Sequence, residues 1–101
     1  MMPDEVKKQL PRLYSQDHKD PKDIPIVVKY FTPDANATWY ITEGDEQPDG
    51  DWMLFGLCDL GLGFPELGNV MLSEIQGVRG RLGLKVERDL HFNGKMLGDV
   101  L

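Results

Sequence analysis

Four short runs of β-branched, aromatic and aliphatic residues alternate with turn-forming residues between positions 26 and 72. The runs cover residues 26–31, 38–43, 52–58 and 68–72, and residues such as Gly, Pro, Asp and Asn separate them. Strands that short loops join pair with their sequence neighbours in antiparallel fashion. This spacing predicts an antiparallel meander of about four or five strands, and it restricts the possible folds more than any other feature of the chain.

The third run, residues 52–58, is apolar on both faces, which is typical of a central strand. In the second run, simple alternation places Trp39, Ile41 and Glu43 on one face of the sheet and Tyr40 on the other. One of the two aromatic residues is therefore expected in the core, and the other is free to lie at the surface.

Short helices are expected before and after these strands. Residues 4–10 form a helix that ends before Pro11, and residues 73–75 form another that Ser73 caps. The 101 residues are expected to be a single domain, with an N-terminal helix and polar connection at 1–24, a β-rich core at 25–92 and a tail at 93–101. The predicted fold class is α+β, a small antiparallel sheet with one or two short helices.

Positive charge is missing from the middle of the chain. The 49 residues from 30 to 78 contain no Lys or Arg and hold nine carboxylates, whereas each flanking segment is slightly positive. The formal net charge of the whole chain is −6. A face that gathered these carboxylates would repel nucleic acid and attract cationic partners, so direct nucleic-acid binding is not expected.

Cys58 is the single cysteine, so the chain can form neither an internal disulfide nor a cysteine metal cluster. Its apolar surroundings favour a buried, inert thiol over a reactive one. The N-terminus lacks the apolar core of a signal peptide, and no run approaches the length of a membrane span. We therefore expect a cytoplasmic protein without membrane contact.

The acidic loop after the second run and two aromatic residues form the candidate binding surface. A solvated hairpin loop is the simpler interpretation, and the carboxylates do not follow the EF-hand spacing, so no metal or other cofactor is predicted. Aromatic side chains supply the large contact area that interfaces favour. The predicted binding residues are Trp39, Tyr40, Glu43, Asp45, Glu46, Asp49 and Asp51.

A polar pocket is the alternative to this surface. Coupled charges in a cleft are typical of ligand-binding and catalytic sites. A Ser–His–Asp triad is not expected, because Ser73 lacks the glycine-flanked turn that exposes a nucleophile. The residues of the alternative pocket are Glu43, Arg79, Arg88, Asp89 and His91.

A basic, glycine-containing loop at residues 79–83 is compatible with anion binding, because Arg can grip a carboxylate or a phosphate with two N–H groups. The loop lacks the Gly-Lys-Ser/Thr ending of a P-loop. In the competing interpretation, Arg79 or Arg88 pairs internally with Glu43 or Glu74. The basic cluster as a whole contains Arg79, Arg81, Lys85 and Arg88.

Motifs spread over residues 10–92 resemble a small bacterial family of domains of unknown function. The motif residues are Thr32, Pro33, Asp34, Asn36, Thr38, Trp39, Tyr40, Thr42, Glu43, Gly44, Phe55, Gly56, Leu57, Glu66, Leu67, Gly68, Leu72, Ser73, Glu74, Val78, Arg79, Gly80, Leu82, Gly83, Leu84, Glu87, Arg88, Asp89, Leu90, His91 and Phe92. The resemblance implies a cytoplasmic protein of about this length, carried on plasmids, phages or other mobile elements, and it implies no particular activity. Against this resemblance, the acidic loop looks shorter than in many members of the family.

Together these features favour a small, non-enzymatic interaction protein of a mobile element, whose acidic face docks on a basic protein surface. One version is an inhibitor that occupies the positive channel of a host nucleic-acid-binding defence complex. The alternative is a small ligand-binding domain, or an enzyme, built on the polar pocket. The chain is expected to be a monomer, or a homodimer formed through an unpaired strand edge.

Overall fold

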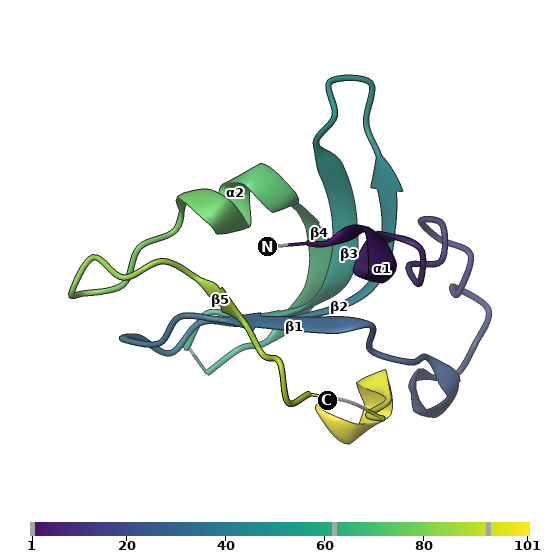
Figure 1. Ribbon diagram of the computed structural model, residues 1–101. Coiled ribbons are helices and arrows are strands. Elements are labelled where there is room, and N and C mark those ends of the chain that lie inside the picture. The colour runs from purple at the N-terminus through teal and green to yellow at the C-terminus, as the bar shows by residue number, and fades with distance from the viewer. Residues whose placement is uncertain (1, 62, 93) are drawn as a thin grey trace.

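The computed structural model describes residues 2–61, 63–92 and 94–101, and its centre is a five-stranded antiparallel sheet (Figure 1). The strands lie in the order β4-β3-β2-β1-β5. Their bounds are β1 Val28–Phe31, β2 Thr38–Glu46, β3 Trp52–Asp59, β4 Glu66–Met71 and β5 Glu87–Arg88. The first four strands therefore form the predicted meander, and β5 returns to pair with the free edge of β1.

Two short α-helices and two 3₁₀ turns accompany the sheet. Their bounds are α1 Asp4–Lys7, η1 Pro21–Asp23, α2 Leu72–Gly77 and η2 Leu97–Asp99. The structure thus confirms a small antiparallel sheet with two short helices. Residue 62 of the predicted turn after β3 and residue 93 of the predicted tail lie outside the described residues.

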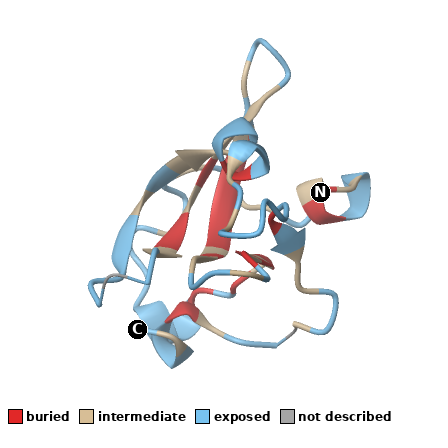
Figure 2. Cartoon of the chain, turned by 90° about the vertical axis from the view of Figure 1, so that its left-hand side faces the viewer, coloured by how far each residue is buried: buried red, intermediate tan, exposed pale blue. Residues whose placement is uncertain are grey.

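One face of the sheet packs against both helices and forms the larger core. Val6 of α1 and Ile75 of α2 meet Val28, Ile41 and Leu54 of the strands there. The buried parts of the sheet are red in Figure 2. Trp39 belongs to this core and is 4% exposed, whereas Tyr40 is half-buried, so the expected division of the two aromatic residues is confirmed.

The opposite face carries a smaller core, to which the segment before β1 and the C-terminal segment contribute. Leu57 of β3 packs there with Ile24 and with Leu97 of η2. The backbone N–H of Leu97 donates to the carbonyl of Ile24 at 2.8 Å, and that of Ile26 donates to Lys95 at 3.0 Å. These bonds hold the C-terminal segment against the start of β1, and the 3₁₀ turn η2 lies within this segment.

A β-bulge in β2 places Glu43 on the face opposite to the one that alternation predicts. Ile41 pairs with Gly56, and Glu43 pairs with the next residue, Phe55, so one extra β2 residue lies between the two pairs. The side chains of Glu43 and Phe55 therefore share the face of the smaller core. A Cβ on Gly56 would lie 1.9 Å from the Tyr40 carbonyl oxygen, so only glycine fits beside the bulge.

Several element boundaries differ from the predicted ones. The first helix ends at Lys7 rather than at residue 10, and β2 continues to Glu46. Residues 84–92 contain only the two-residue β5 and an isolated bridge at Lys85. Ser73 is not the cap of α2, because the helix begins one residue earlier, at Leu72. Within the described ranges, none of the helices has the length and apolar character to cross a membrane.

Candidate functional site

Glu43 is buried and holds a turn of the N-terminal segment. Its Oε1 accepts a hydrogen bond from the backbone N–H of Tyr14 at 3.1 Å, and its Oε2 accepts one from Gln16 at 2.7 Å. Tyr14 needs this support because its φ of 65° lies in the left-handed region that residues other than glycine rarely adopt. Glu43 is 1% exposed, so its carboxylate serves the fold and does not form part of a surface.

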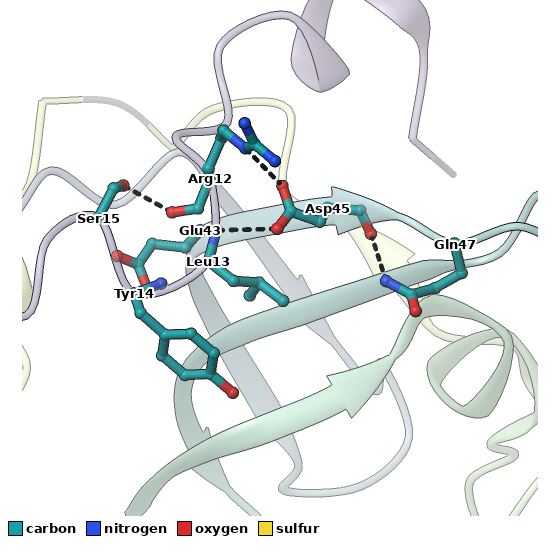
Figure 3. A network of polar contacts seen from close by, with 7 residues as sticks. All are labelled: Arg12, Leu13, Tyr14, Ser15, Glu43, Asp45 and Gln47. Atoms are coloured by element: carbon teal, nitrogen blue, oxygen red, sulfur yellow. Dashed lines mark hydrogen bonds and ion pairs between the residues drawn. The ribbon is translucent and has the colours of Figure 1, made fainter.

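Asp45 repeats this arrangement two residues further along β2. Its Oδ2 accepts a hydrogen bond from the backbone N–H of Leu13 at 3.3 Å, and its Oδ1 lies 3.8 Å from Arg12 Nε (Figure 3). Between the two carboxylates, the N–H of Gly44 donates to the carbonyl of Pro11 at 2.9 Å. The N-terminal segment is thus fastened along β2, at the base of the acidic hairpin.

The β2–β3 hairpin projects from the body of the protein and carries the acidic loop at its tip (Figures 1 and 2). Glu46 and Asp49 are exposed. Asp49 Oδ1 accepts the backbone N–H of Asp51 at 3.0 Å, and Gln47 exchanges backbone hydrogen bonds with Asp51 and Gly50. Backbone donors therefore fix the turn while its carboxylates remain in contact with solvent.

Asp51 links the hairpin to α2. Its Oδ2 accepts a hydrogen bond from Ser73 Oγ, and its Oδ1 accepts the backbone N–H groups of Trp52 and Ser73. These bonds, the one from the Ser73 hydroxyl above all, lower the pKa of Asp51 below its ordinary value. Asp51 is therefore a fixed negative charge beside the first turn of α2 at neutral pH.

The nine carboxylates of residues 30–78 are not gathered on one face. Five lie near the hairpin or at the first turn of α2, and Glu43 lies inside. Antiparallel pairing sends the other three to the opposite end of the sheet, because β1, β2, β3 and β4 all begin or end there. Those three are Asp34, Asp59 and Glu66.

Tyr40 and Trp39 do not frame the hairpin. Trp39 is in the larger core, and Tyr40 lies on the opposite face, where its ring centroid is 6.2 Å from that of Phe92. Lys29 Nζ lies 5.7 Å from the Tyr40 ring and 3.5 Å from Asp89 Oδ2. Tyr40 is thus the partner of a lysine that the sequence did not single out.

The five residues of the alternative pocket lie on three separate cavities. Glu43 lines a small, largely apolar cavity of about 170 Å³ on the face of the smaller core. Asp89 and His91 line a second cavity with Tyr40. Arg79 and Arg88 line a third, of about 410 Å³, without Glu43, Asp89 or His91. The predicted convergence of all five residues therefore does not occur.

Two further groups have perturbed acid–base behaviour. Burial raises the pKa of Tyr30 to about 12, and the positive charge of Arg88 partly opposes that rise. Burial also raises the pKa of the Cys58 thiol, as expected for an inert cysteine. In the part of the chain that the structure covers, no group of three His, Cys, Asp or Glu side chains could hold a metal ion.

Asp34 is the residue with a long-range role that sequence reasoning missed. Its Oδ2 accepts hydrogen bonds from the backbone N–H groups of Leu82 at 2.6 Å and Leu84 at 3.4 Å. The turn sequence around Asp34 explains a local role and gives no sign of a partner 48 residues away. The structure explains the glycine at position 80, because a Cβ there would collide with the Asp34 carboxylate.

Comparison with known proteins identifies a family and no activity. The model of the family DUF2958, described as a protein of unknown function, matches residues 1–97. The chain belongs to this family, so the predicted resemblance to a family of domains of unknown function is confirmed. No curated protein and no solved structure matches the chain significantly. The link to mobile elements stays a prediction.

Proposed function

We propose that this member of the DUF2958 family is a non-enzymatic interaction protein that docks its acidic β2–β3 hairpin on a basic surface of a protein partner. The observation that carries this proposal is the projection of the hairpin from the sheet (Figure 1). A projecting tip reaches a concave or flat partner without clashes between the two bodies. The proposed docking residues are Asp45, Glu46, Asp49 and Asp51, which are four of the seven binding residues predicted from the sequence.

The charges of the hairpin support this proposal. Asp45 forms an ion pair with Arg12, and no other hairpin carboxylate pairs with a cation of the described residues. Asp51 is ionised at neutral pH, and its lowered pKa keeps it ionised to a more acidic pH than an ordinary aspartate. Unpaired carboxylates on a tip attract Lys and Arg side chains of a partner and increase the rate of association, and salt screens both effects.

The sheet offers a matched control for this surface. Glu46 and Asp49 lie on the hairpin, and Glu66 and Asp59 lie at the opposite end of the sheet. Asp49 and Asp59 each accept a backbone N–H from the residue two positions ahead, at 3.0 Å and 2.9 Å. The double variants E46K/D49K and E66K/D59K therefore change the net charge equally and disturb similar turns.

The test measures binding of a ten-residue oligolysine peptide at low and high salt, followed by capture of partners from bacterial lysate. E46K/D49K is expected to weaken oligolysine binding by about tenfold or more, roughly the effect of losing two charged contacts, and to lose any salt-sensitive partner. E66K/D59K is expected to change both by much less. Equal losses in the two variants would show that only net charge matters and would reject the hairpin as the docking element.

A narrower form of the proposal concerns the partner. If the partner is a nucleic-acid-binding defence complex of the host, the protein competes with nucleic acid for the positively charged channel of that complex. Adding the protein should then release bound nucleic acid, and E46K/D49K should not. A captured partner that binds nucleic acid equally well with and without the protein would reject this narrower form.

A further inference from the structure

A cavity of about 410 Å³ between α2, the loop that follows it and β5 is lined by three cationic side chains. Two other side chains complete its wall, so that the lining residues are Gln76, Arg79, Lys85, Val86 and Arg88. No carboxylate lines it. A protein of net charge −6 thus has a concave site where positive charge is concentrated.

The loop of residues 79–85 brings two of these cations together. Arg79 and Lys85 form an antiparallel bridge, so their side chains leave the same side of the backbone. The N–H of Gly80 donates to the carbonyl of Leu84 at 3.1 Å, and Gly83 closes the turn with a φ of 78°. Like charges placed opposite one another repel, so this pairing is unfavourable unless an anion offsets it.

The third cation comes from the sheet. Arg88 of β5 is the direct partner of Tyr30 in β1, so both side chains lie on the face of the larger core, which α2 also covers. Val86 is 4% exposed, and it fixes the chain beside the cavity. Arg88 is half-buried, whereas Arg79 and Lys85 are exposed, so the three cations line the cavity from its wall to its rim.

The internal pairing that the sequence left open is not formed. The ion pairs of the described residues join Lys7 to Asp4, Arg12 to Asp45 and Lys29 to Asp89, and none includes a cation of this cavity. Glu74 instead accepts the backbone N–H of Met71 at 3.0 Å, and Glu43 is buried on the other face of the sheet. The cationic side chains therefore lack a carboxylate partner within the described chain.

Arg79 is held in position while part of its guanidinium stays free. One of its terminal nitrogens, Nη1, donates to the carbonyls of Gln76 and Val78, both at 2.8 Å. The N–H groups on Nε and Nη2 make no hydrogen bond to the described residues, so they can donate to a bound oxyanion. A prepositioned guanidinium loses less conformational entropy on binding than a flexible one does.

We propose that this cavity binds the phosphate group of a small molecule. Three positive charges suit a phosphate monoester, which carries about −1.5 to −2 at neutral pH, better than a carboxylate with its single charge. The cavity is larger than one phosphate group requires, which leaves room for an organic part beside Gln76 and Val86. This inference is independent of the acidic hairpin and uses residues of the opposite charge.

The test measures binding of inorganic phosphate, adenosine monophosphate (AMP) and adenosine to the full chain by isothermal titration calorimetry at constant salt. Lys85→Gln and Arg88→Gln are the informative variants, because neither side chain holds the end of α2. Arg81→Gln is the matched control, since Arg81 belongs to the same loop but lines a different cavity, with Asp34. Circular dichroism checks that each variant is folded.

Phosphate and AMP are expected to bind, and adenosine is expected not to bind. K85Q and R88Q should each weaken the affinity for phosphate and AMP by about tenfold. R81Q should change this affinity by less than about twofold. Tighter binding of AMP than of phosphate identifies a phosphorylated organic ligand, and equal binding identifies the phosphate group alone. Three results would overturn the proposal. The first is the absence of saturable phosphate or AMP binding at millimolar ligand, and the second is a loss of affinity in R81Q equal to that in K85Q and R88Q. The third is that a single-stranded oligonucleotide binds far more tightly than AMP does and that K85Q and R88Q lose this oligonucleotide binding.

Discussion

The β2–β3 hairpin and the loop of residues 79–85 are held in similar ways and carry opposite charges. In each, a carboxylate accepts backbone hydrogen bonds: Asp49 accepts one within the hairpin, and Asp34, from the turn between β1 and β2, accepts two from the loop. The hairpin carries the exposed Glu46 and Asp49 at its projecting end, whereas the loop lies along a cavity that its cations line. The comparison shows that shape, as well as charge, separates docking on a large partner from binding of a small anion.

The largest expected effect comes from the sheet that supports both regions. Gly56→Ala would place a methyl group 1.9 Å from the Tyr40 carbonyl oxygen, a backbone atom held by strand pairing. We expect a loss of about 3 kcal/mol in the free energy of unfolding, and weaker oligolysine and phosphate binding together. Urea denaturation measures the stability change.

Gly68→Ala is the matched control for this prediction. Gly68 pairs directly with Gly56 across β3 and β4, and no heavy atom lies within 4 Å of an added Cβ. Its effect on stability should remain within about 0.5 kcal/mol. Equal effects of the two substitutions would mean that the bulge beside Gly56 does not hold the two regions in place.

Tyr30, the strand partner of Arg88, makes the stability of the protein depend on pH in the alkaline range. Because its pKa is raised to about 12 in the folded protein, its contribution is fully present below the ordinary value of about 10 and is lost as the pH rises toward 12. The predicted loss is about 3 kcal/mol, measured by urea denaturation at several pH values. Tyr30→Phe should remove this part of the pH dependence, and an unchanged profile would contradict the assignment.

Asp34→Ala tests whether the two regions are independent. The substitution leaves the N–H groups of Leu82 and Leu84 without their acceptor, which should cost about 1–2 kcal/mol of stability. Phosphate binding should weaken because the 79–85 loop loosens, and oligolysine binding should stay unchanged. If calorimetric titrations show that Asp34→Ala weakens phosphate binding and oligolysine binding by similar factors, the two regions are coupled rather than separate.

The smallest expected effect concerns the acidic region. Ser73→Ala removes the hydroxyl that donates to Asp51, so the pKa of Asp51 should rise toward its ordinary value. Ser73→Thr keeps a hydroxyl and should keep the low pKa. Carboxyl chemical shifts followed by NMR across an acid titration measure the change, and identical titration curves for wild type and Ser73→Ala would show that the hydroxyl does not stabilise the carboxylate.

Much of the sheet was predictable because its strands are local patterns. The runs before and after the turns correspond to β1, β2, β3 and β4 within a few residues, and β3 is an interior strand as its apolar pattern indicates. The bulge in β2 was not predictable. An extra residue between two pairs depends on how β3 aligns with β2, and alternation within one strand contains no such information.

The candidate sites depended on contacts between distant residues, and those predictions fared less well. Glu43 was expected at a surface or in a polar pocket, but the bulge turns it toward the segment of Tyr14 and Gln16. Sequence identified the basic cluster and left its pairing open. The absence of a carboxylate beside Arg79 and Lys85 follows only from the three-dimensional arrangement of the described residues.

The most direct test of the account is one NMR experiment with two ligands. ¹⁵N-labelled protein is titrated separately with the oligolysine peptide and with AMP, and shifts of backbone amide signals are mapped on the chain. We predict that oligolysine shifts residues 45–51 and that AMP shifts residues 76–88, with little overlap. Shifts by both ligands in the same residues, or scattered over the whole sheet, would contradict the division of the molecule into an acidic docking hairpin and a basic anion site.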